Sequence, residues 1–164
     1  GWANDAPSFQ LWVTNGWDQP STRKAAAVGG RIQQSIGVGT IGLSATYGAI
    51  AEANPKLMLD LDVALTFGAL RIGAQLNYGN QLDFDSFGAL LSLNYAFTDA
   101  FSMTLRGDYL DREIFGSEYK GAATTLAGLV NLTKGFDIIA ELRADLPDGD
   151  DTIVTGALEL LASF

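Results

Sequence analysis

The sequence predicts an all-β fold, namely a closed antiparallel up-and-down transmembrane β-barrel of about ten strands that makes residues 1–164 a single domain. Three observations predict it. The chain is 48% hydrophobic, yet it has no run of about 18 apolar residues, so a transmembrane helix is excluded. Apolar and polar residues alternate from Val154 to Phe164, as a barrel strand with one lipid-facing side requires. The apolar face of that segment also ends on an aromatic residue, Phe164.

A C-terminal aromatic residue at the end of an apolar face is the feature that bacterial outer-membrane barrels present to their assembly machinery. We therefore expect Phe164 to be the assembly signal and the barrel-assembly machinery to be a partner of the C-terminal strand. The chain has no Cys, which fits a compartment where free thiols are oxidised. No signal peptide opens it, and we interpret residues 1–8 as a short periplasmic lead-in of a mature chain.

Ten strand-like segments can be marked off between Gly, Pro, Asn and Asp residues, and most approach the ~9 to 11 residues with which a tilted strand crosses a membrane. In chain order they span Phe9–Asn15, Lys24–Ile36, Thr40–Ala49, Leu57–Phe67, Leu70–Tyr78, Ser86–Phe97, Phe101–Leu110, Gly121–Leu132, Phe136–Asp145 and Thr152–Phe164. An even number is required if both termini lie on one side of the membrane, so eight and twelve strands are the alternatives to ten.

The segments differ in how clearly they alternate. The fourth is the clearest, because every odd-numbered residue from Leu57 to Phe67 is apolar while Asp60 and Asp62 lie on the other face. The second segment places Gln34 on the same face as its Ile residues, and the eighth is mostly Ala, Gly, Thr and Leu with little contrast. A β-bulge or a shifted register would explain either.

The connections between the segments alternate in length. Those after the second, fourth, sixth and eighth segments are tight turns, whereas those after the odd-numbered segments are mostly longer and charged, the longest being Asp111–Lys120. Short turns on one rim and long loops on the other are typical of the periplasmic and extracellular ends of an outer-membrane barrel. A water-soluble β-sandwich would share the alternation but not this placement of the connections.

Aromatic residues gather near both ends of the predicted strands, as expected of rings that prefer the two membrane interfaces. Next to the short turns and the termini lie Phe9, Phe67, Phe97, Phe101, Phe136 and Phe164. Next to the long loops lie Trp17, Tyr47, Tyr78, Phe87, Tyr109 and Tyr119. The lipid face between these two girdles is almost wholly aliphatic, which predicts an aliphatic belt across the membrane.

The predicted register gathers ionisable residues on the face opposite the apolar one. These lumen-facing candidates are Arg31, Asp60, Asp62, Arg71, Arg106, Asp108, Asp137, Glu141, Arg143, Asp145 and Glu159. All four basic members are Arg, whose planar guanidinium binds carboxylates through two hydrogen bonds. Two interpretations stay open: the groups neutralise one another as internal packing, or they line a narrow water path whose excess carboxylates favour cations. Small inward residues such as Gly42 and Gly73 leave room for a passage, whereas Trp12 and Leu90 narrow it.

This composition is poorly suited to catalysis. With no His and no Cys, the usual general base, the thiol nucleophile and the commonest metal ligands are missing, so the sequence predicts no enzyme, no cofactor and no metal site. Gly37–Gly42 matches the G-x-G-x-x-G pattern, but without a strand-to-helix context it indicates a Gly-rich hairpin turn. The acidic segment Asp145–Asp151 lacks the spacing of a calcium loop and indicates a solvated surface loop. A net charge of −9 argues against nucleic acid as a partner.

The segment Leu11–Asp18, which reads Leu-Trp-Val-Thr-Asn-Gly-Trp-Asp, resembles a segment of the putative beta-barrel porin family of Gram-negative outer membranes. Arg23 and Lys24, followed by a small-residue strand with Gly29, Gly30 and Arg31, resemble what comes next in that family. The resemblance implies an outer-membrane barrel with porin activity. Because family members are usually longer, this chain resembles their C-terminal part. Three explanations of its short length are open: the chain is a naturally small relative, a truncated or engineered form, or one barrel of a larger envelope assembly.

These observations predict a barrel in the outer membrane of a Gram-negative bacterium, with both termini periplasmic and membrane lipid as its surroundings. The expected function is a narrow, weakly cation-preferring porin-like channel for ions or small solutes. The alternative is a plugged, non-conducting barrel that serves as a structural, anchoring or partner-binding subunit of an envelope assembly. A homo-oligomer or a larger envelope complex is compatible with either.

Overall fold

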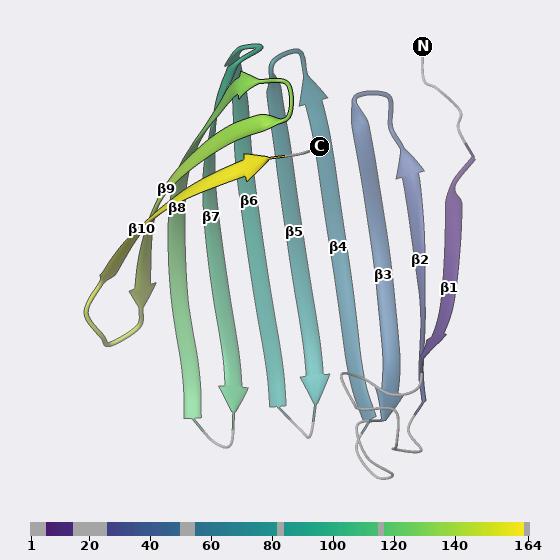
Figure 1. Ribbon diagram of the computed structural model, residues 1–164. Helices are drawn as coiled ribbons and strands as arrows, with labels where there is room; N and C mark the ends of the chain where they lie inside the picture. The colour runs from purple at the N-terminus through teal and green to yellow at the C-terminus, as the bar shows by residue number, and fades with distance from the viewer. Residues whose placement is uncertain (1–5, 15–25, 50–54, 82–83, 115–116, 163–164) are drawn as a thin grey trace.

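The structure is a computed structural model that describes residues 6–14, 26–49, 55–81, 84–114 and 117–162. These residues form a ten-stranded antiparallel sheet in which every strand pairs with its neighbours in the sequence (Figure 1). The strands are β1 (Ser8–Thr14), β2 (Ala27–Ser35), β3 (Gly39–Ala49), β4 (Pro55–Phe67), β5 (Leu70–Gln81), β6 (Phe84–Thr98), β7 (Phe101–Ile114), β8 (Ser117–Thr133), β9 (Phe136–Pro147) and β10 (Ile153–Ala162). The predicted class, strand number and up-and-down order are confirmed. No helix among the described residues is long and apolar enough to cross a membrane.

Three of the four connections at one end of the sheet are tight turns that contain a Gly residue. The turns after β2, β4 and β8 contain Gly37, Gly68 and Gly135, whose φ angles are 77°, 59° and 83°. Only Gly adopts this left-handed conformation without strain, so these residues fix the position of each reversal. Since β2 ends just before Gly37 and β3 begins at Gly39, the G-x-G-x-x-G segment is a hairpin, as predicted.

The hairpin of β7 and β8 is longer than the sequence predicts. The expected loop over Asp111–Lys120 is wrong, because the two strands remain paired until only residues 115–116 separate them. Arg112 lies opposite Tyr119, with the guanidinium carbon 5.2 Å from the ring centre. The Lys120 ammonium lies 3.6 Å from the Asp111 carboxylate. Such cross-strand contacts prolong a ladder beyond the end of the apolar alternation.

The register separates an apolar face from a polar one throughout the sheet. On the apolar face Leu61 of β4 lies opposite Leu43 of β3 and Leu76 of β5, whereas the next residue, Asp62, lies opposite Gly42 and Gln75. The apolar side chains remain exposed, and the buried apolar residues of the described chain are Ala27 and Ala123. The apolar surface therefore faces outward rather than into a packed core, as contact with lipid requires.

The two strands with weak alternation, β2 and β8, differ in their local structure. In β2, Gln34 lies on the apolar face opposite Ile41, as predicted, and its amide donates a 2.9 Å hydrogen bond to the carbonyl of Ser35 beside the turn. In β8 the register with β9 shifts between Asn131 and Thr133. This β-bulge lies at the end of β8 beside the turn, and the register before it is regular, so the weak contrast of β8 comes from its small residues. In the second strand a polar residue lies near the rim.

The first and last strands form the two edges of the sheet. The described residues include no ladder between β1 and β10, and every described residue of β10 is exposed. The sheet curls along its length, so that β9 and β10 run obliquely to β1–β6 (Figure 1). An unpaired backbone edge is costly in lipid, because each unsatisfied N–H or C=O loses its hydrogen bond. We therefore expect β1 to pair with β10 in the membrane.

The closing register follows from barrel geometry. The row of paired residues that begins at Ser8 of β1, near the short turns, can be followed from strand to strand. It reaches β10 at Ile153, which lies at the opposite rim. Ten strands that lie about 4.8 Å apart and tilt by about 40° require a stagger of about 12 residues when each residue rises about 3.3 Å. This stagger places Val13 opposite Leu160, two exposed apolar residues of the outer face.

Closure predicts a disulfide between engineered thiols at these two positions. The chain has no Cys of its own, so the doubly substituted Val13→Cys, Leu160→Cys protein contains one pair of thiols. Opposed residues of antiparallel strands lie within disulfide range, and we expect oxidation in lipid vesicles to cross-link the chain internally. The matched pair Val13→Cys, Val154→Cys is expected to stay reduced. Cross-links between copies, or none in either protein, would contradict closure of this chain on itself.

Candidate functional site

The ionisable candidates share one face of the sheet, which we call the inward face. The register connects them in rows across the strands, such as the row from Ser92 through Arg106 and Thr125 to Arg143. The same alternation puts all of the predicted lumen-lining residues on this face: Arg31, Asp60, Asp62, Arg71, Arg106, Asp108, Asp137, Glu141, Arg143, Asp145 and Glu159. Their role in lining a pore stays a prediction.

One network occupies the inward face of β2 to β5. The Arg31 guanidinium donates hydrogen bonds of 2.6 and 2.9 Å to the two oxygens of Asp62, and it lies 4.0 Å from Asp60. The Gln75 amide donates to Asp60 at 2.5 Å and to Asn77 at 3.3 Å. One guanidinium nitrogen per carboxylate oxygen is the strongest geometry for such a pair. Here one guanidinium is shared by two carboxylates, so the Arg31 charge is neutralised and the network keeps one negative charge.

Glycine provides the space for this pair. Gly42 lies beside Asp62 in the ladder, and a Cβ atom at Gly42 would lie 2.6 Å from the Arg31 guanidinium carbon and 2.7 Å from Asp62 Oδ2. Likewise, a Cβ atom at Gly29 would lie 2.6 Å from an indole carbon of Trp12, which packs across β2 from β1. The expected inward position of Trp12 is thus produced by a missing side chain opposite it.

Two further ion pairs lie on β7 and β9. The Arg106 and Arg143 guanidinium groups each bind the carboxylate two residues ahead, Asp108 and Asp145, at 2.6 and 2.7 Å. Residues two apart on a strand share a face, so each pair forms within one strand. Thr125 of β8 lies between the two arginines in the register and is 6% exposed. The two ion pairs therefore stand on either side of the buried Thr125 side chain.

The geometry of these two pairs differs from that of Arg31 and Asp62. Arg106 donates from Nε and Nη2 to the same oxygen, Asp108 Oδ1, and Arg143 binds Asp145 Oδ1 in the same way. The second oxygen, Asp108 Oδ2, is buried and receives no hydrogen bond from a described residue. Burial of a polar atom without a donor costs free energy, so Asp108 is the atypical carboxylate of this face.

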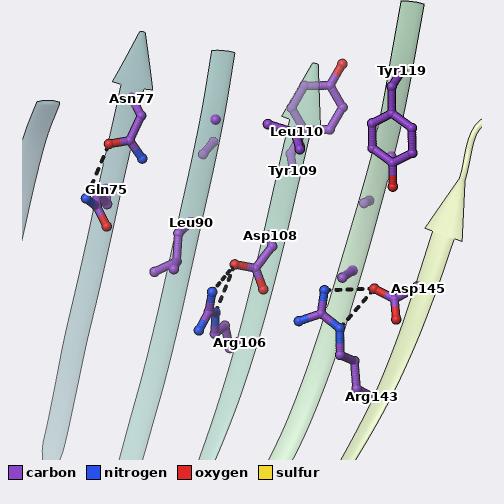
Figure 2. A pocket seen from close by; sticks show the side chains of 15 residues that line it. Gln75, Asn77, Leu90, Arg106, Asp108, Tyr109, Leu110, Tyr119, Arg143 and Asp145 are labelled. Atoms are coloured by element: carbon purple, nitrogen blue, oxygen red, sulfur yellow. Dashed lines mark hydrogen bonds and ion pairs between the residues drawn. The ribbon is translucent and has the colours of Figure 1, made fainter. Parts of the chain in front are cut away.

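Two hollows lie in the inward face around these pairs. The first, which we call the β5–β9 hollow, has a volume of about 360 Å³ and is lined by polar side chains of Gln75, Asn77, Arg106, Asp108, Tyr119, Arg143 and Asp145, together with Leu90 and Leu110 (Figure 2). The second, of about 400 Å³, includes Asn94, Thr104, Glu141 and Leu129, and it shares Arg106 and Arg143 with the first. Leu90, the leucine expected to narrow the lumen, thus lines the first of these hollows.

Several predicted candidates stand apart from the ion pairs. Arg71, Asp137, Glu141 and Glu159 form no ion pair or hydrogen bond with the residues that the structure describes. Among the predicted candidates without such a contact, carboxylates therefore outnumber guanidinium groups by three to one, and Arg112 of β7 lies on the same face against the Tyr119 ring. This excess of carboxylates gives the predicted candidates of the inward face a net negative charge.

The aromatic girdles follow the prediction with one exception. At the short-turn rim, Phe97 stacks on Phe101 with ring centres 5.5 Å apart. At the opposite rim, the Tyr78 hydroxyl donates a 2.7 Å hydrogen bond to Asp85. Outward-facing positions at the two rims also hold Phe9, Tyr47, Phe67, Phe87, Tyr109 and Phe136. Tyr119 instead lies on the inward face beside the β5–β9 hollow, because β8 begins earlier than the sequence predicts. Trp17 and Phe164 lie outside the described residues.

Sequence reasoning missed part of this site. Gln75 and Asn77 line the β5–β9 hollow, and the search for ionisable residues passed over them. The sequence pattern could have identified them, because both residues fall on inward positions of β5 between Gly73 and Gly79. Uncharged polar residues at inward positions deserve the same weight as charged ones in a strand with one lipid-facing side.

Comparisons with known proteins agree on the architecture. Residues 2–158 match the sequence model of a family described as "Putative beta-barrel porin-2, OmpL-like". A loop-deletion mutant of OmpT, an outer membrane protein of Vibrio cholerae, superposes with a TM-score of 0.75 at 12% identity, over 96% of this chain and 60% of that one. KdgM porin superposes with a TM-score of 0.51 at 16% identity, over 94% of this chain and 81% of that one. No curated protein matches the sequence. The chain thus spans 60% of the length of the Vibrio cholerae protein and shares its fold.

Proposed function

Since this chain belongs to the OmpL-like porin-2 family of outer-membrane β-barrels, we propose that it forms a narrow, weakly cation-preferring channel for ions or small solutes. The observation that carries the proposal is the division of ten strands into an exposed apolar face and an inward face of ion pairs, amides and hollows. A barrel of about ten strands lies close to the size that side chains fill, so any passage is thin.

The direction of the ion selectivity follows from the uncommitted charges. Arg31, Arg106 and Arg143 are each held by a carboxylate. Among the predicted lumen-lining residues this leaves Asp137, Glu141 and Glu159 against Arg71, and Asp60 shares Arg31 with Asp62. In a confined passage of low dielectric, unpaired carboxylates attract cations more strongly than they would in bulk water. The small size of this excess supports a weak preference rather than a strict one.

Neutralising two of these carboxylates is expected to reduce the cation preference. In planar bilayers with a KCl gradient, the reversal potential of Glu141→Gln, Glu159→Gln protein should shift toward the anion side relative to the parent. Arg71→Gln should shift it the other way, because that change removes the opposing charge. Asp99→Asn is the control, since Asp99 lies in the short turn between β6 and β7 and its loss should leave the reversal potential unchanged.

The same recording decides between a channel and a plugged barrel. Discrete conductance steps whose selectivity follows these substitutions would support the channel. A silent bilayer, obtained with protein whose β-sheet circular dichroism shows that it is folded, would refute conduction. It would favour the plugged barrel that serves as a structural, anchoring or partner-binding subunit. A selectivity shift of equal size in Asp99→Asn would refute the assignment of the inward carboxylates.

A further inference from the structure

The β5–β9 hollow exists because large side chains are missing from its floor. Gly88 of β6 and Gly121 and Ala123 of β8 face inward there, and Ala123 is 7% exposed. A Cβ atom at Gly88 would have its nearest neighbours at 3.7 to 3.9 Å. A Cβ atom at Gly88 would therefore fit in ordinary van der Waals contact beside Asn77, without a clash. A volume of about 360 Å³ is within the range of small-molecule sites.

The polar lining of the hollow carries no net charge. Arg106 and Arg143 are balanced by Asp108 and Asp145, and the remaining polar groups are two amides and the Tyr119 hydroxyl. Figure 2 shows the two ion pairs and the amides arranged around the same space. A cation bound at Asp108 would lie beside the Arg106 guanidinium, and an anion bound at the arginines would lie beside the carboxylates. Both arrangements are unfavourable, so the lining suits a neutral ligand.

The two carboxylates also have unused acceptor capacity. Each arginine directs its hydrogen bonds to one carboxylate oxygen, and Asp108 Oδ2 is buried without a donor among the described residues. Asp108 lines the hollow, and the carboxylate torsion of Asp is soft, so rotation about it can offer this oxygen to a ligand. A hydroxyl group that donates to it would satisfy the acceptor and strengthen the site, because hydrogen bonds to charged acceptors are the stronger kind.

We propose that the β5–β9 hollow binds a neutral polyhydroxylated solute of the size of a mono- or disaccharide, with the carboxylates of Asp108 and Asp145 as hydroxyl acceptors and the guanidinium groups of Arg106 and Arg143 as donors. This inference rests on the proposed function, since it names the solute class that the channel takes up. Binding at the inward face and ion conduction are nevertheless separate properties and are measured separately.

Sucrose is the probe, and saturation-transfer NMR with the full chain refolded in detergent micelles measures its binding without any need for conduction. We expect sucrose to bind and tetraethylene glycol dimethyl ether, which has no hydroxyl donor, not to bind. Asp108→Ala should weaken sucrose binding by about 10-fold or more, the effect of losing one hydrogen bond to a charged acceptor. Gly88→Leu should abolish it by filling the hollow.

Asp137→Ala is the matched control, because Asp137 is an inward carboxylate of β9 outside both hollows. Its affinity for sucrose should stay within about 2-fold of the parent. Circular dichroism of every variant confirms that the barrel is folded before binding is compared. Since Gly88→Leu fills the hollow without touching an ion pair, it tests the site even if Asp108→Ala fails to fold.

Three results would overturn the assignment: no sucrose binding by the folded parent, unchanged binding in Gly88→Leu, or competition in which Ca²⁺ displaces sucrose and binds more tightly. The last outcome would make the hollow a cation site. A protein that binds sucrose but conducts no ions would refute the channel and leave the site standing. A conducting protein that binds no sucrose would refute the site alone.

Discussion

Replacing Leu105 with Arg is expected to lower the free energy of unfolding of this protein in a lipid bilayer by about 2 to 4 kcal/mol. Leu105 lies midway along β7 between Phe101 and Tyr109, it faces outward, and it is 51% exposed. Its ladder partners are Leu93 and Leu126, so an Arg there has no carboxylate within the apolar belt. The cost arises because the guanidinium must remain solvated near the middle of the membrane.

Thr104→Arg is the matched control for this prediction. Thr104 is the preceding residue of β7, and it lies opposite Asn94 on the inward face beside the second hollow. The same charge placed there meets polar groups and water, and we expect it to change the free energy of unfolding by less than about 1 kcal/mol. Urea titration in vesicles, followed by Trp fluorescence, measures both variants. Equal destabilisation of the two would contradict the division of the sheet into a lipid face and an inward face.

Substituting Gly39 by Ala is expected to destabilise the protein by about 3 kcal/mol, the upper end of the cost of overpacking. A Cβ atom at Gly39 would overlap the Ala64 carbonyl oxygen and would lie 2.8 Å from the Cα atom of Leu65. Both contacts are with backbone, which cannot move without breaking the ladder between β3 and β4. The change should lower the urea midpoint and slow refolding into detergent micelles.

Gly107 supplies the comparison, because it is also a strand glycine of the outward face, and no atom lies within 4 Å of the position that its Cβ would take. Gly107→Ala should be neutral, or stabilising by about 0.4 to 1 kcal/mol through the lower entropy of the unfolded chain. If Gly39→Ala were tolerated as well as Gly107→Ala, the close approach of β3 to the backbone of β4 would be wrong.

The sequence predicts the strands well, because the alternation of apolar and polar residues is a local property that each strand carries independently. Eight of the predicted segments differ from the observed strands by three residues at most at each end, whereas Phe101–Leu110 ends four residues before β7 does and Gly121–Leu132 begins four residues after β8 does. These two larger errors have one physical cause. The ladder of β7 and β8 continues past the apolar belt through the contacts of Arg112 with Tyr119 and of Lys120 with Asp111, and such contacts join residues that no periodic pattern relates.

The inward face was predictable only as a set of residues. Alternation assigned Asp108 and Asp62 to the same face, but it did not indicate that Asp62 is held through both oxygens and Asp108 through one. That difference depends on the neighbouring strand: Gly42 leaves room beside Asp62 for the Arg31 guanidinium to approach from β2, whereas Asp108 is bound by an arginine of its own strand.

By itself the sequence determined the fold class, the number and order of the strands, the face on which each side chain lies and the family resemblance, since all of these are read from residues close together in the chain. The tertiary structure decided which inward charges neutralise one another, which carboxylates remain uncommitted, and where missing side chains open a hollow. These features depend on the register between strands, because the register sets which side chains from distant parts of the sequence come within hydrogen-bonding distance.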